Sequence, residues 1–304
     1  MTALGMVGLG RMGGNMARRL RQGGHRVVAT TRDPERLRQA VASDGVEGAD
    51  NIAALCARLE VPRIVWLMLP AGDATATAID AAAAVLDAGD ILVDGGNAHW
   101  RDSVARARTL AGRGVHFLDA GVSGGIWGLS EGYCLMIGGP RVAFDRAEPI
   151  LRTLAPPDGY LHVGESGAGH FVKMVHNGIE YALMQAYGEG FELLERSGLG
   201  LDLPRIAALW NRGSVVRSWL LELATRALAA NPRLDGISGW VEDSGEGRWT
   251  VLQAVESGVP TPAIAQALFQ RFASRQPDAF GLRLIAALRD EFGGHGVHRP
   301  SDVG

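Results

Sequence analysis

Short apolar runs alternate with amphipathic segments through the first half of the chain. The runs are rich in β-branched residues and predict strands. They lie at residues 3–7, 26–30, 64–69, 91–94, 116–120 and 133–137. Segments 15–22 and 74–86, which fall between the first strands, have the Ala, Leu and Arg content of helices. Strands that alternate with helices are typical of a mostly parallel sheet with helices on its faces.

The pattern changes after residue 163, where long helical segments replace the strands. Helices are predicted at residues 169–196, 204–210, 214–229, 249–257, 262–274 and 279–292. We therefore predict an α/β fold, with a Rossmann-type doubly wound sheet at residues 1–163 and an all-helical domain at residues 164–304. The first helix of the second domain is expected to form a wall between the domains, where ligand clefts tend to lie.

Composition narrows the possible partners. The chain has 304 residues, a net charge of −3 and no run of basic residues, which argues against nucleic acid or an acidic membrane and favours a small molecule. No apolar run reaches the length of a membrane span, and no signal segment precedes the first strand. Two widely spaced cysteines, Cys56 and Cys134, indicate a reducing cytoplasm, and no spacing predicts a metal site.

The only lysine among the 30 Lys and Arg residues is Lys173. It is spaced i, i+3, i+4, i+7, i+8 with His176, Asn177, Glu180 and Tyr181, so all five share one helix face. The flanking residues are apolar, which predicts that this polar stripe is buried. A buried lysine can act as a general base, because unlike arginine it can release its proton. The alternative is an internal ion pair that only holds helices together.

A Gly-x-Gly-x-x-Gly motif follows the first strand and opens a helix. Gly8 permits a tight turn, Gly10 lets the backbone approach a pyrophosphate, and Gly13 lets the helix pack on the strand. The helix N-terminus then faces the anion. The motif predicts a dinucleotide site, and a purely structural turn is the alternative.

The end of the second predicted strand bears on the choice of dinucleotide. NAD enzymes usually carry an acid there, which holds the ribose hydroxyls. Thr31 occupies that position, and Arg32 beside it suits the 2′-phosphate of NADP. Asp33 could still hold the ribose, so both NADP and NAD stay open, with NADP favoured.

Five motifs then occur in order along the chain. They are Gly8-Leu-Gly10-x-Met12-Gly13, Leu69-Pro-Ala-Gly72, Val93-Asp-Gly-Gly-Asn97, Gly121-Val-Ser123-Gly-Gly125 and Gly167-x-Gly169-x-x-x-Lys173-x-x-x-Asn177. Together they resemble the 3-hydroxyacid dehydrogenase superfamily. Within it, the segments 94–97 and 173–181 look like the decarboxylating 6-phosphogluconate dehydrogenase family. Sibling 3-hydroxyisobutyrate-type enzymes usually show a second Asn after the Asn177 position and lack the Glu-Tyr pair.

The resemblance implies an activity with named roles. The reaction would be oxidative decarboxylation of 6-phosphogluconate, a sugar-acid phosphate, to ribulose 5-phosphate and CO2, with reduction of NADP or NAD and no metal. Lys173 would act as general base and then as acid, and Glu180 would protonate C1 of the enediol.

The resemblance also implies binding residues. For the cofactor they are Gly8, Leu9, Gly10, Arg11, Met12, Gly13, Thr31, Arg32, Asp33, Leu69, Pro70, Ala71 and Asn97. For the carboxylate and hydroxyls of the substrate they are Asn97, Ser123, Gly124, Gly125, His176 and Asn177. For the phosphate they are Tyr181, Arg271 and His295. The family's tail, around the His295 position, implies a homodimer or homotetramer with shared active sites.

The chain departs from the long family members in one segment. Residues 242–248, Glu-Asp-Ser-Gly-Glu-Gly-Arg, place acids where a phosphate-binding lysine is expected. An unphosphorylated sugar acid such as gluconate is therefore the alternative substrate. The chain also lacks the second helical repeat of the long members and resembles the short bacterial type, in which NAD use is common. A dinucleotide-binding sensor without turnover is a further alternative, against which the intact Lys173, Asn177 and Glu180 argue.

Overall fold

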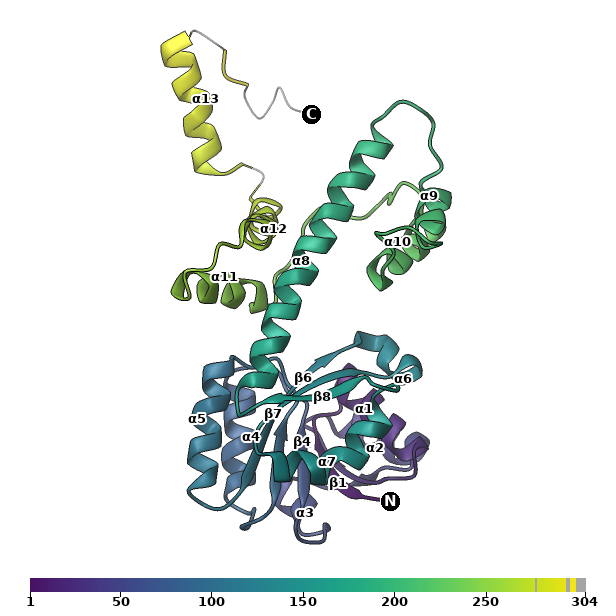
Figure 1. Ribbon diagram of the computed structural model, residues 1–304, viewed down its shortest axis with the longest axis vertical. Helices are drawn as coiled ribbons and strands as arrows, with labels where there is room; N and C mark the ends of the chain where they lie inside the picture. Colours follow the sequence, from purple (N-terminus) through teal and green to yellow (C-terminus); the bar gives the residue numbers. More distant parts are fainter. Residues whose placement is uncertain (277, 294–295, 299–304) are drawn as a thin grey trace. The chain divides into compact units, whose positions relative to one another are not determined.

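The computed structural model describes residues 1–276, 278–293 and 296–298. The chain divides into two compact units, Met1–Asn177 and Gly178–Gly304. Strands lie in the first unit, and the described part of the second is helical (Figure 1). The predicted α/β class with a helical C-terminal part is therefore confirmed. Helix α8 (Ala168–Glu195) runs across the division, and the predicted domain boundary at residue 163 stays a prediction.

One sheet of eight strands forms the centre of the first unit, in the order β3-β2-β1-β4-β5-β6-β7-β8. The strands are β1 (Ala3–Val7), β2 (Arg26–Thr30), β3 (Glu47–Gly48), β4 (Ile64–Leu67), β5 (Ile91–Asp94), β6 (His116–Ser123), β7 (Cys134–Gly138) and β8 (Tyr160–Gly164). Neighbours from β3 to β6 are parallel, whereas β7 is antiparallel to β6 and parallel to β8. The sequence missed only the outermost strands β3 and β8, which carry little buried apolar signal.

Helices cover both faces of this sheet (Figure 1). One face carries α1 (Arg11–Gln22), α2 (Pro34–Asp44) and α7 (Arg141–Leu154), and the other carries α3 (Ile52–Cys56), α4 (Asp73–Ala83) and α5 (Trp100–Ala111). Successive strand residues point to opposite faces, so Trp66 packs in one core cluster and its neighbours Val65 and Leu67 in the other. Burial on both faces explains the continuous apolar runs of the sequence.

The described part of the second unit contains the rest of α8 and five further helices. They are α9 (Leu203–Trp210), α10 (Trp219–Ala230), α11 (Glu246–Glu256), α12 (Pro262–Ala273) and α13 (Phe280–Gly293). Helix α9 packs on α10, and α11 packs on α12. Helix α10 was predicted to begin at residue 214 but begins at Trp219, because the Ser218 side chain accepts the N–H of Leu221 and caps the helix there.

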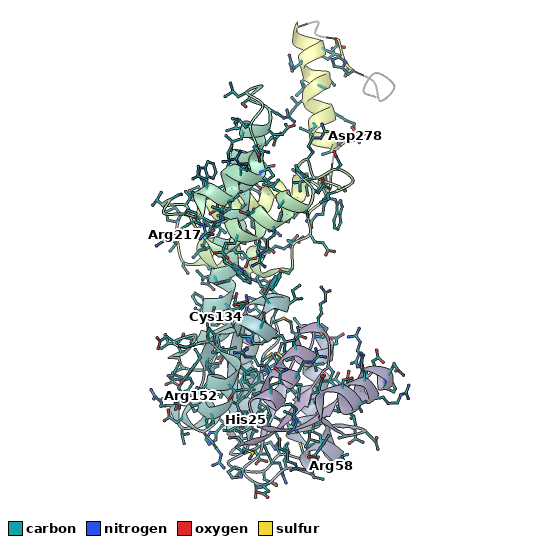
Figure 2. All side chains as sticks on the ribbon, turned by 90° about the vertical axis from the view of Figure 1, so that its right-hand side faces the viewer. His25, Arg58, Cys134, Arg152, Arg217 and Asp278 are labelled. Atoms are coloured by element: carbon teal, nitrogen blue, oxygen red, sulfur yellow. The ribbon has the colours of Figure 1, made fainter. Side chains whose placement is uncertain are left out.

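The two cysteines are free thiols with different surroundings. Cys56 is buried on α3, where burial raises the pKa of its thiol to about 11. Cys134 is exposed at the start of β7 (Figure 2). Across the residues that the structure describes, no group of three or more His, Cys, Asp or Glu side chains could hold a metal ion. None of the helices described there has the length and apolarity to cross a membrane.

Candidate active site

The predicted dinucleotide motif lies where the strand order reverses. The chain passes from β1 to β2 and β3 on one side, whereas β4 pairs with β1 on the other side. Ligands of doubly wound sheets bind at such a switch point. Gly8 has φ +95°, and a Cβ there would lie 2.5 Å from the carbonyl oxygen of Met68. A Cβ on Gly13 would lie 2.0 Å from the carbonyl oxygen of Gly8, so both glycines are needed for this close packing.

The start of α1 fits a pyrophosphate. Its N-cap residue Gly10 provides no side-chain cap, and the first turn carries no acid. A Cβ on Gly10 would meet nothing within 4 Å, so the space beside it is open. The first N–H groups of α1 can therefore bind an anion, which the helix dipole also favours. Around the motif Leu9 is buried, Met12 is half-buried and Arg11 is exposed.

The residues after β2 differ in the contacts that their side chains already make within the chain. The Asp33 carboxylate caps α2 by accepting the N–H groups of Glu35 at 3.0 Å and Arg36 at 3.3 Å, and it pairs with the Arg36 guanidinium at 3.1 Å. Arg32 is exposed, and no carboxylate in the described part of the chain pairs with it. Thr31 is half-buried beside it. Arg32 is thus the available cation at this strand end.

The loops after β4 and β5 lie together. A Cβ on Gly96 would be 2.6 Å from the carbonyl oxygen of Leu69. Asp94, fully buried at the end of β5, pairs with Arg106 at 3.0 Å and accepts the N–H of Gly96 at 3.1 Å. These contacts fix the loop that ends in exposed Asn97, close to the loop of Leu69, Pro70 and Ala71.

Strand β6 holds the start of α8. The Asp119 carboxylate, fully buried on β6, accepts the N–H groups of Gly167 at 2.6 Å and His170 at 2.9 Å. A Cβ on Gly121 would lie 2.5 Å from the Cβ of Lys173. Gly121 therefore lets the helix approach the strand closely, and Lys173 is buried with 8% of its surface exposed. The prediction of a buried lysine on this helix is confirmed.

A series of hydrogen bonds links His176 to two neighbours on the Lys173 side of α8. Nδ1 of His176 and Oδ1 of Asn177 are 2.9 Å apart, and Nε2 of His176 is 3.4 Å from the Ser123 hydroxyl. An amide oxygen only accepts, so Nδ1 donates; in the neutral ring Nε2 then accepts from Ser123. Gly124 and Gly125, both with positive φ, form the turn after Ser123. The first unit thus brings Lys173, His176, Asn177 and Ser123 to one place.

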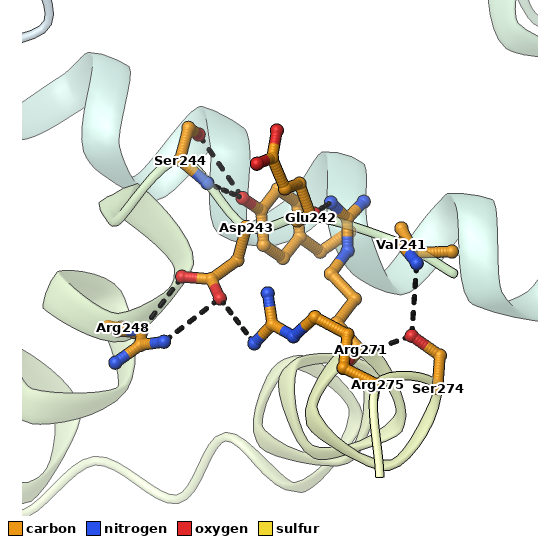
Figure 3. A network of polar contacts seen from close by, with 9 residues as sticks. Val241, Glu242, Asp243, Ser244, Arg248, Arg271, Ser274 and Arg275 are labelled. Atoms are coloured by element: carbon orange, nitrogen blue, oxygen red, sulfur yellow. Dashed lines mark hydrogen bonds and ion pairs between the residues drawn. The ribbon is translucent and has the colours of Figure 1, made fainter. Parts of the chain in front are cut away.

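The second unit brings together Tyr181 and Arg271, and Figure 3 shows Arg271 among its polar neighbours. The Arg271 guanidinium lies 3.5 Å above the centre of the Tyr181 ring and donates to the carbonyl oxygen of Glu242 at 2.7 Å. The Tyr181 hydroxyl accepts the N–H of Ser244 at 3.1 Å. In the described ranges no carboxylate pairs with Arg271. Glu180 is half-buried on α8, and His295 lies outside the described residues.

The sequence suggested that the acids of segment 242–248 weaken phosphate binding, but Asp243 in this segment is already paired with arginines. Asp243 pairs with Arg248 at 2.7 Å and with Arg275 at 2.9 Å, and its side chain is 3% exposed (Figure 3). The hydrogen bond from Arg248 is the main cause that lowers the pKa of Asp243 to about 2. Two guanidinium groups therefore neutralise this carboxylate, and Arg271 keeps its charge available.

The sequence analysis missed two buried acids, Asp119 on β6 and Glu246 on α11. Asp119 lies within an apolar strand, and a lone acid in such a run was a signal of a buried, hydrogen-bonded carboxylate. Glu246 lies between two glycines just before an apolar helix, where a buried acid is unexpected.

Comparisons with known proteins cover nearly the whole chain. Residues 3–164 match the NAD binding domain of 6-phosphogluconate dehydrogenase, and residues 169–283 match the C-terminal domain of that enzyme. A decarboxylating, NAD(+)-dependent 6-phosphogluconate dehydrogenase of Haloferax volcanii is 47% identical over 98% of this chain and 99% of its own length. An NADP(+)-dependent decarboxylating relative of Bacillus subtilis is 37% identical over 89% of this chain, which spans 61% of that relative.

A solved structure agrees. The 6-phosphogluconate dehydrogenase of Plasmodium falciparum, studied in apo form and in complex with NADP+ and with 6-phosphogluconate, superposes with a TM-score of 0.84 at 30% identity. The superposition covers 98% of this chain and 66% of the Plasmodium chain. Matched from one end to the other in both domains, the chain belongs to the 6-phosphogluconate dehydrogenase family of NAD(P)-dependent oxidoreductases.

Proposed function

We propose that this chain catalyses the oxidative decarboxylation of 6-phosphogluconate to ribulose 5-phosphate and CO2, with reduction of NADP or NAD. One observation carries the proposal: the only lysine of the chain is buried against β6, on the same face of α8 as His176 and Asn177. Membership of the family supports the reaction class.

Lys173 begins the reaction as a base. In this role its neutral amine takes the proton of the C3 hydroxyl. NAD(P), held at the Gly8–Gly13 turn, would supply the acceptor for the hydride that leaves C3. Ser123, His176 and Asn177 supply the hydroxyl, imidazole and amide groups that orient the carboxylate and hydroxyls of the sugar acid. Asn97, at the end of the β5 loop, orients the same end of the substrate.

Decarboxylation follows from the β-keto acid. The C1–C2 bond breaks, CO2 leaves, and its electron pair forms an enolate whose oxygen is the former C3 carbonyl. Lys173, now an ammonium, returns its proton to that oxygen and so stabilises the charge that develops in the transition state. Glu180 then protonates C1 of the enediol, which is the former C2 of the substrate. Lys173 takes back the proton of the hydroxyl on the former C3 as the carbonyl forms there again, which gives ribulose 5-phosphate.

In this proposal, Arg271 and Tyr181 bind the phosphate group of the substrate. Arg271 has no carboxylate partner in the described part of the chain, whereas Arg248 and Arg275 both pair with Asp243. A guanidinium can bind a phosphate through two parallel hydrogen bonds. At the cofactor end, Arg32 supports binding of the 2′-phosphate of NADP, because the nearby Asp33 carboxylate is already used as a helix cap.

We propose in addition that the chain forms a homodimer through its second unit. Helix α13 exposes large apolar side chains, with exposed fractions between 47% and 71%. They are Phe280, Leu282, Leu284, Ile285 and Leu288. A second copy of the chain would cover this surface, since apolar side chains exposed together on one helix can mark an interaction site.

Absorbance at 340 nm, followed with NAD and with NADP, tests the reaction. The substrates are 6-phosphogluconate and, separately, gluconate, and released CO2 is trapped. We expect turnover with CO2 release on the phosphorylated acid and a higher kcat/KM with NADP. Turnover on gluconate alone would instead favour the unphosphorylated substrate.

A lysine variant tests the mechanism. Lys173→Arg keeps the positive charge but cannot act as a base, so we expect kcat to fall by about 10³-fold or more while the dissociation constant of NAD(P) stays within about threefold. The control is Arg196→Lys, at an exposed ion pair with Glu192 beyond the end of α8, which is expected to keep full activity. A Lys173→Arg enzyme of normal rate would contradict the assigned role.

A further inference from the structure

The second unit contains two neighbouring buried acids whose surroundings differ. Asp243 has both carboxylate oxygens held by guanidinium groups. Glu246, the first residue of α11, is 2% exposed, and its Oε2 accepts a hydrogen bond from the Ser244 hydroxyl. Its other oxygen, Oε1, is buried and has no hydrogen-bond donor in the described part of the chain. Leaving a buried acceptor unsatisfied costs about 1–3 kcal/mol and more for a charged group, so a ligand that donates to Oε1 would bind favourably.

Glu246 belongs to the cluster to which we assign the phosphate. The Ser244 hydroxyl that donates to Glu246 is 3.2 Å from the Tyr181 hydroxyl, and Arg271 lies over the Tyr181 ring. Gly247 allows this contact, because a Cβ there would be 2.5 Å from the Tyr181 ring. The Glu246 carboxylate, through Ser244, and the guanidinium of Arg271 are therefore both linked to the same tyrosine. Figure 3 shows the network on its Asp243 side.

The charges around Glu246 are few. Helix α8 contributes the Tyr181 phenol, α12 contributes Arg271, and the segment after α12 contributes Arg275. Helix α11 contributes Arg248, which pairs with Asp243 of the preceding segment, as Arg275 also does. Arg271 is thus the one guanidinium of this described network that has no carboxylate partner.

A phosphate dianion carries only acceptor oxygens, so it would repel the bare oxygen of Glu246. A phosphate monoester has its second pKa near about 6, which makes one added proton accessible at neutral pH. We infer that this site binds the phosphate ester together with one extra proton, held between a phosphate oxygen and Oε1 of Glu246. Glu246 is then a specificity-determining residue that recognises a protonated phosphate, and the inference rests on the proposed function.

Two consequences follow. Binding above about pH 7 takes up about one proton, so the affinity for the phosphate ester falls roughly tenfold for each further pH unit. The site also separates phosphate from sulfate, because sulfate carries no proton to donate at neutral pH. Inorganic phosphate is expected to compete with 6-phosphogluconate at least about tenfold more strongly than sulfate does at pH 7.

Calorimetry on the intact wild-type chain tests the inference. Binding of 6-phosphogluconate is measured at pH 8 in two buffers that differ in ionisation enthalpy. We expect uptake of about one proton per ligand. Turnover assays on the same sample separate the two proposals: absent turnover contradicts the proposed function, whereas turnover without proton uptake contradicts only the present inference.

A matched pair of variants tests whether Glu246 holds the proton that is taken up when the phosphate ester binds. Glu246→Gln replaces the carboxylate by an amide that can donate to a dianion, so proton uptake disappears and affinity at pH 8 rises at least about tenfold. Glu256→Gln removes the same charge from the exposed end of α11, and wild-type proton uptake is expected to persist there. Unchanged uptake in Glu246→Gln would overturn the inference, as would equal competition by phosphate and sulfate in the wild type.

Discussion

The two units differ in how they hold their functional side chains. The first unit has two extensive buried clusters, one on each face of the sheet. The described part of the second unit buries only small clusters, one around Leu203, Ala207, Leu221 and Leu228 and one around Tyr181, Ala267 and Leu268. Its polar network relies instead on ion pairs and hydrogen bonds between helices and one connecting segment.

The two units therefore hold their functional side chains in place by different kinds of contact. Lys173 is fixed by backbone packing. Gly121 on β6 and Gly169 on α8 bring the strand and the helix so close that a Cβ on either would clash with the other element. Arg271 is fixed by polar contacts, which depend on pH and salt. We therefore expect steric changes to damage the first region most, and changes of charge or of assembly to damage the second.

Among changes that leave the proposed reacting groups in place, the largest effect is expected from Gly121→Ala. The added Cβ would lie 2.5 Å from the Cβ of Lys173, so the helix must move away from β6 and displace the amine. We expect kcat to fall about 100-fold with KM for NAD(P) nearly unchanged, because such a displacement misaligns the base. Steady-state kinetics measure this split. The control is Gly188→Ala on the same helix as Lys173, where an added Cβ meets nothing within 4 Å and so causes no such clash.

A smaller effect is expected from the exposed face of α13. Leu284→Glu combined with Leu288→Glu places two charges on adjacent turns of the apolar surface. If this surface joins two copies, the dimer dissociation constant should rise at least about tenfold. Sedimentation velocity over a concentration series measures it. An unaltered dimer, or a wild-type monomer, would remove α13 as the interface.

The smallest effect concerns the pH dependence of stability. The pKa of Asp243 is lowered to about 2 from 3.8, so its ion pairs stabilise the folded state fully above the unfolded value and lose that contribution as the pH falls toward 2. Asp243→Asn should lack this loss, and urea unfolding between pH 4 and pH 2 measures the difference. Asp145→Asn, at an exposed pair with Arg141, is the control and should change little. Identical pH profiles for wild type and Asp243→Asn would show that the pairs contribute nothing.

The sequence predicted the parts of the site that depend on near neighbours. The turn at Gly8, the helix that follows it, and the polar stripe from Lys173 to Tyr181 all follow from spacing within about two helical turns. The edge strand β8 was missed because its residues are half-exposed and give no apolar run. The start of α10 was predicted too early because apolar spacing alone does not reveal where a serine caps a helix.

Sequence alone determined the two-part fold, the anion-binding turn and a single lysine on a buried helix face, because backbone preference and hydrophobic period act over a few residues. Only the tertiary structure decided which charges are neutralised. Asp119 caps a helix 48 residues away, and Asp243 pairs with an arginine 32 residues away. The same acidic segment that predicted a weak phosphate site contains one neutralised carboxylate and one with an unsatisfied oxygen. Electrostatic pairing depends on distance in space, which the order of residues does not specify.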